Sequence, residues 1–292
     1  MDLPISAQAI QHVENYLSQG DFDAALPELL EMRDAVEDYV KEACPASDEV
    51  QYFCFADSFE RLAYRRVEKD PRTLVQVGAP FDRMYADLAF VYINQREFGL
   101  ARDALKQAVR WNPMNCAYRL DLAELYRVLG NENEWGALAY SVLERAADAK
   151  LFGRACAALG QFFLNKDEPL LASGFARRAA AFALGERATR QVLARLMQEA
   201  PDAANASDEE TAQELSSQGF PTDPNAEIAI CLLMCATDAS KAGERDEADP
   251  LLPLRARAPR GEDACAALIQ LIHESDAELE AERAEAEGGA DA

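Results

Sequence analysis

The chain has 292 residues, of which 49% are hydrophobic and 28% charged, so it can bury a core large enough for two domains or one extended repeat array. Its 52 acidic and 29 basic residues give a net charge of −23, which repels nucleic-acid phosphates and anionic membrane surfaces. We therefore expect neither nucleic acid nor a membrane among its partners.

The sequence is expected to be that of a cytoplasmic protein. Its first residues, MDLPISAQAIQHVENY, lack the basic and apolar stretches of a leader segment, and no apolar run approaches the roughly 20 residues of a spanning helix. Seven cysteines lie scattered through apolar patterns, as reduced core thiols do in the cytosol.

Residues 1–47 are predicted to form a degenerate helix pair, with GDFDAAL as the turn into its second helix. Residues 48–67 are predicted to form a helix rich in aromatic side chains. The stretch DPRTLVQVGAP that follows has no helical period, so we expect an irregular connection up to residue 81.

The clearest element is residues 82–115, where two amphipathic helices are predicted to pair. Apolar residues recur at i, i+3, i+4 and i+7 in each half, and Pro113 ends the second helix. The buried faces are predicted to carry Tyr85, Leu88, Ala89 and Tyr92 in the first helix and Ala101, Leu105 and Ala108 in the second.

The same pattern predicts further units at residues 116–152 and 153–186 and a half unit at 187–200. The second unit departs from the pattern at Trp135, where a small residue is expected. The third unit restores it, with Leu159, Gly160, Phe163, Ala172, Ala176 and Ala179 in the expected places.

The C-terminal part is predicted in three segments. Residues 201–222 are acidic and poorly periodic and are expected to be a linker, with a short helix possible near 209–217. Residues 223–284 are predicted to form a helical cap related to the repeats, and residues 285–292 a disordered acidic tail.

The spacing of residues 82–115 resembles the tetratricopeptide repeat, because all eight signature positions of that 34-residue unit hold a residue of the right kind. The runs WNPMNCAYRLDLAELYRVLGN and RACAALGQFF also resemble uncharacterised bacterial tetratricopeptide proteins. The resemblance implies an all-α fold, a right-handed α-α superhelix (solenoid) of antiparallel helix pairs.

The sequence offers few residues for catalysis. It has only two histidines, and it lacks phosphate-binding glycine loops and the GxSxG motif, so we expect no enzyme, no bound cofactor and no metal site. Cys231 and Cys235, four residues apart in IAICLLMCA, could ligate a metal or form a redox pair, but their apolar context favours a packing face.

The resemblance also implies a peptide-binding groove, since positions 2, 5, 9 and 12 of each repeat usually line the concave surface. The groove residues that we carry over are Arg83, Phe90, Ile93, Leu120, Glu124, Arg127, Arg154, Gln161 and Leu164.

From this groove we expect a non-catalytic scaffold that binds a protein or peptide partner. One alternative is a cytoplasmic regulator that senses a ligand or peptide and acts through a partner protein. A second alternative, an enzyme, is disfavoured by the scarcity of histidine.

Overall fold

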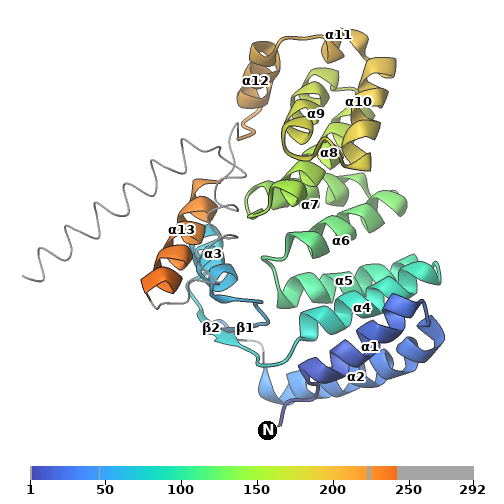
Figure 1. The fold of residues 1–292 in the computed structure, drawn as a ribbon, viewed down its shortest axis with the longest axis vertical. Helices are drawn as coiled ribbons and strands as arrows, with labels where there is room; N and C mark the ends of the chain where they lie inside the picture. The colour runs from blue at the N-terminus through green and yellow to red at the C-terminus, as the bar shows by residue number, and fades with distance from the viewer. Residues whose placement is uncertain (1, 46, 222–224, 242–292) are drawn as a thin grey trace, which may run out of the picture.

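The computed structural model describes residues 2–45, 47–221 and 225–241, which form an all-α solenoid apart from one small sheet (Figure 1). The stack begins with α1 (Ala7–Gln19) and α2 (Phe22–Ala43) and continues through three further pairs. These are α4 (Phe81–Asn94) with α5 (Phe98–Trp111), α6 (Cys116–Val128) with α7 (Glu132–Leu143), and α8 (Ala149–Asn165) with α9 (Pro169–Ala183).

Local sequence explains where the helices begin and turn. Several begin at a side chain that accepts a backbone N–H of the first turn, which satisfies an otherwise unpaired donor. These residues are Ser6, Asp21, Asp57, Asn115, Asp148 and Ser207. Gly20 and Gly130 occupy turns between paired helices at φ 75° and 78°, a conformation that glycine adopts without steric cost.

The predicted buried faces of residues 82–115 are confirmed. Tyr85, Leu88, Ala89 and Tyr92 are at most 9% exposed, and the three named residues of α5 are at most 3% exposed. In the next pair, Trp135 is buried and its ring lies edge-on to Phe162, 5.8 Å away. A Cβ at the neighbouring Gly136 would lie 2.8 Å from the Phe162 ring. The glycine therefore leaves room for the ring on which Trp135 packs.

Residues 48–81 differ from the prediction of an aromatic helix and an irregular connection. They form β1 (Val50–Phe53), α3 (Ser58–Glu68) and β2 (Thr73–Gln76), with the two strands parallel and Val50 opposite Thr73. Of the aromatic residues in this stretch, Phe59 and Tyr64 lie on α3 as predicted, whereas Phe53 lies on β1 and Phe55 follows that strand. All four belong to one core cluster, in which the rings of Phe53 and Phe55 stack at 4.6 Å.

The small sheet is fixed to the stack through α5. The Cys54 backbone N–H donates to the Trp111 carbonyl at 2.8 Å, and Arg110 Nη1 donates to the Tyr52 carbonyl at 3.2 Å. This unit therefore packs on the C-terminal end of α5.

Residues 201–222 are not a free linker. After α10 (Arg187–Glu199), the chain forms α11 (Pro201–Ala204) and α12 (Asp208–Ser217), and α12 packs on α9. Leu215 is 3% exposed and meets Gly174 of α9, so the acidic side chains lie on the outer face of a docked helix.

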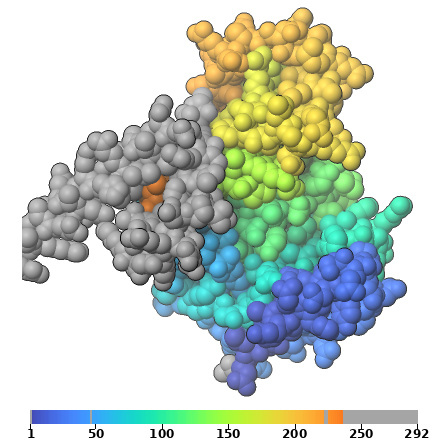
Figure 2. All heavy atoms as spheres, viewed as in Figure 1, coloured from blue at the N-terminus to red at the C-terminus, as the bar shows by residue number. Residues whose placement is uncertain are grey.

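The segment predicted to be a C-terminal cap begins with α13 (Ala226–Lys241), which packs on α3 and does not extend the stack (Figure 1). Its residues Ile228, Cys231 and Leu232 are buried, and Glu227 pairs with Arg66 of α3 at 2.5 Å. Space-filling atoms show a continuous surface from α1 and α2 to α12 (Figure 2). The rest of the predicted cap, residues 242–284, and the predicted acidic tail of residues 285–292 lie outside the described residues.

Candidate functional site

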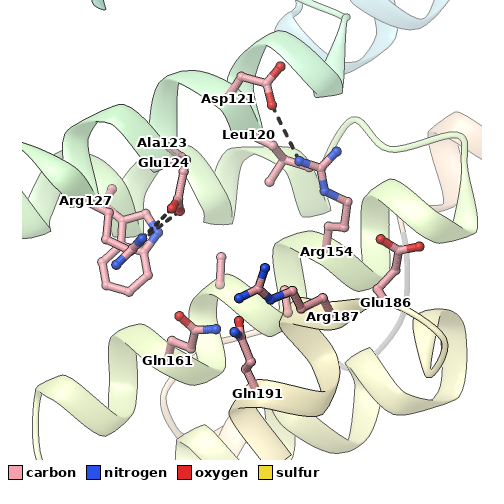
Figure 3. A pocket seen from close by; sticks show the side chains of 13 residues that line it. Leu120, Asp121, Ala123, Glu124, Arg127, Arg154, Gln161, Glu186, Arg187 and Gln191 are labelled. Carbon is pink, nitrogen blue, oxygen red and sulfur yellow. Dashed lines mark hydrogen bonds and ion pairs between the residues drawn. The ribbon is translucent and has the colours of Figure 1, made fainter. Parts of the chain in front are cut away.

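The first helices of three successive units, α6, α8 and α10, line most of an open groove of about 570 Å³, to which α7 adds Trp135 (Figure 3). We call it the α6–α8–α10 groove. Its lining residues are Leu120, Asp121, Ala123, Glu124, Arg127, Trp135, Arg154, Ala158, Gln161, Glu186, Arg187, Ala188 and Gln191.

Helix periodicity brings these side chains to one surface. Residues three or four apart share a helical face, so Leu120, Glu124 and Arg127 of α6 point the same way. Arg154, Ala158 and Gln161 do the same on α8. Glycine at position 160 lets α8 approach its neighbours closely, since a Cβ there would lie 2.9 Å from Val192 of α10.

Most of the charges in the groove are already paired. Arg127 forms an ion pair with Glu124 on α6, and Arg154 Nη2 lies 3.5 Å from Asp121 Oδ1. Burial raises the pKa of Asp121, and the Arg154 charge acts in the opposite direction. Glu186 Oε1 lies 3.2 Å from Lys150 Nζ at the edge of the groove.

Arg187 is different, because it forms no ion pair with any residue that the structure describes. Figure 3 shows its side chain running from the start of α10 into the groove, toward Gln161 and Gln191. The groove therefore holds one unneutralised positive charge beside two side-chain amides.

Five of the nine predicted groove residues line this groove: Leu120, Glu124, Arg127, Arg154 and Gln161. Leu164, from the same unit as Gln161, instead packs partly buried against the core.

The three predicted residues of α4 lie outside the α6–α8–α10 groove. Arg83 Nη2 pairs with Glu14 of α1 at 2.5 Å, and Ile93 packs partly buried against the N-terminal core. Phe90 is 46% exposed, with its ring edge-on to Phe22 at 5.8 Å. The reason is that the N-terminal helix pair packs on α4 and engages these side chains.

The prediction from repeat positions missed the contribution of α10. Residues 187–200 are predicted to form only a half unit, with no groove residue among them. Positions 2 and 5 of that half unit are Ala188 and Gln191, and both line the groove. Carrying the groove positions over to this half unit therefore predicts both residues. It does not predict Arg187, which is the first residue of the half unit and not at a groove position.

The cysteines of the described core are buried among apolar side chains. Cys54, Cys116 and Cys156 are buried, which raises the pKa of each thiol to about 12 and keeps it in the protonated, weakly nucleophilic form at neutral pH. Cys231 lies on α13 and belongs to the apolar cluster between α13 and α3, and burial raises the pKa of its thiol to about 11.

The described part of the chain has neither a cluster of metal ligands nor a membrane-spanning helix. No group of three or more His, Cys, Asp or Glu side chains is placed to hold a metal ion. Among the same residues, no helix has the length and apolar character needed to cross a bilayer.

The chain is similar to the solved structure of Pseudomonas aeruginosa pilF, with 15% sequence identity and a TM-score of 0.46 over 92% of this chain and 96% of that chain. No family model matches the chain, and no curated protein matches it. The description of the fold as a tetratricopeptide-like solenoid therefore rests on its own helix pairs.

Proposed function

We propose that the protein is a non-catalytic, cytoplasmic scaffold that binds a peptide segment of a protein partner in the α6–α8–α10 groove. The observation that carries the proposal is the groove itself, about 570 Å³ in volume and lined by the first helices of three successive units. A rigid stack holds such a surface in place before binding, which lowers the entropy lost on association.

Two further observations support this choice. The groove places charged and amide side chains above a floor formed by Leu120, Ala123 and Trp135, which are at most 5% exposed, and binding sites use such convergent polar groups for orientation. The buried thiols with raised pKa values are poor nucleophiles, in keeping with a binding role and a reducing compartment.

The test is to fill the groove. Peptides selected by the wild-type protein from a displayed random library would be synthesised with a fluorescent label, and their affinity measured by anisotropy. Gln191→Trp places a bulky ring in the groove and is expected to weaken binding at least tenfold. Gln213→Trp, an equally exposed site on α12 outside the groove, is the matched control and should bind as wild type does.

Equal binding by both variants would exclude the groove as the site. Circular dichroism and the thermal midpoint of each variant would show that the two proteins are equally folded. Failure of the folded wild-type protein to select any peptide would contradict the proposed function.

A further inference from the structure

We infer that the occupant of the α6–α8–α10 groove is an acidic peptide segment, held by a salt bridge between one of its Asp or Glu side chains and Arg187. This inference rests on the proposed function and names the chemistry of the partner.

The charged side chains that line the groove are paired within the described part of the chain, except for one arginine. The six charged side chains of its lining are three arginines and three carboxylates. Arg127 is neutralised by Glu124 and Arg154 by Asp121, while Glu186 is neutralised from outside by Lys150. Among the described residues, Arg187 is left as the unmatched charge, so the groove has a local excess of one positive charge.

The neighbours of Arg187 favour the same ligand. The side-chain amides of Gln161 and Gln191 lie beside it in Figure 3, and the described residues give neither amide a hydrogen-bond partner. An amide nitrogen and a planar guanidinium can donate together to the two oxygens of one carboxylate, and arginine binds that group through two parallel hydrogen bonds.

The position of Arg187 favours a side chain over a chain terminus. In Figure 3 it lies between the Glu124–Arg127 pair on one side and Glu186 on the other. A segment that crosses the groove therefore continues past Arg187 in both directions and meets it with a residue from its interior.

The negative charge of the rest of the molecule does not prevent this recognition. With a net charge of −23, the protein repels acidic peptides over most of its surface. At physiological ionic strength this repulsion is screened beyond about 8 Å, so the local charge at Arg187 decides the interaction in the groove.

The experiment uses the full chain and two phage-displayed heptapeptide libraries, one with the peptide joined to the phage at its C-terminus and one with a free C-terminus. Wild type is expected to enrich, from the first library, peptides with Asp or Glu at one fixed position. For a selected peptide made with a C-terminal amide, Arg187→Gln should weaken binding about tenfold, and Glu→Gln in the peptide should weaken it equally. Combining the two changes should cost little more than either alone.

Arg190→Gln is the control, because it removes the same charge from an exposed residue of α10 outside the groove. Wild-type affinity in this variant is expected, and an equal loss in both variants would overturn the inference. Enriched peptides without an acidic position, or enrichment only from the library with a free C-terminus, would overturn it and leave the proposed function standing. If wild type enriches no peptide from either library, both fall.

Discussion

The close contact of α8 with α9 makes Gly153→Ala a sharp test of how the helix pairs pack. A Cβ at position 153 would lie 2.4 Å from the Cβ of Ala183, about 1 Å inside an ordinary contact. Both atoms are fixed to helix backbones, so the helices would have to separate. Overpacking of this kind typically costs about 1–3 kcal/mol, against a gain of about 1 kcal/mol in helix propensity. We expect a net loss of up to about 2 kcal/mol in unfolding free energy, measured by urea denaturation.

Two variants make this prediction specific. Gly99→Ala on α5, where no atom lies within 4 Å of the new Cβ, should leave stability unchanged or slightly raised. Adding Ala183→Gly to Gly153→Ala should recover most of the loss, because the nearest remaining atoms are the Ala183 nitrogen at 3.1 Å and Cα at 3.4 Å. A Gly153→Ala protein as stable as the Gly99→Ala protein would refute the close approach of α8 and α9.

Two further predictions concern pH and the C-terminal helix. Burial, together with the charges of Glu14 and Asp82, raises the pKa of Asp87 to about 7, and its Oδ2 atom is buried without a hydrogen-bond partner. Because the folded state then holds a proton that the unfolded state releases near pH 4, stability should fall between about pH 4 and 7, and Asp87→Asn should exceed wild type by about 1–3 kcal/mol at pH 8. A pH profile of unfolding free energy that Asp87→Asn does not flatten would contradict this. Leu232→Ala, at a fully buried site on α13, should cost about 2–4 kcal/mol in the contact with α3. Hydrogen exchange should then speed up in α3 and α13 and not in α8, and unchanged protection of α3 would show that α13 is not docked there.

The helix pairs could be predicted because their pattern is local. Leu88, Ala89 and Tyr92 recur at the helical spacing and are buried in the structure, and turns follow at glycine or polar residues. The small sheet could not be predicted this way. VQYF and TLVQ are only four residues long, and Val50 meets Thr73 through a parallel pairing that leaves no local repeat in the sequence.

The candidate site was predicted in part for a similar reason. The repeat rule identifies which side chains of α6 and α8 face the groove, and Arg154 and Gln161 are where it places them. It contains no information on which repeats stay uncovered. The pairing of Arg83 with Glu14 depends on how the N-terminal helices pack on α4, which is a tertiary property.

The central claim, that a partner peptide lies in the α6–α8–α10 groove, is tested most directly through Trp135. It lines the groove, and Trp111 is the only other tryptophan of the chain. In a Trp111→Phe variant, a selected peptide should shift the Trp135 emission with the same dissociation constant that anisotropy gives. Trp135 is 2% exposed at the floor of the groove, so the contradicting result is a joint one: saturable binding by anisotropy with no change in Trp135 emission and with undiminished affinity in Gln191→Trp.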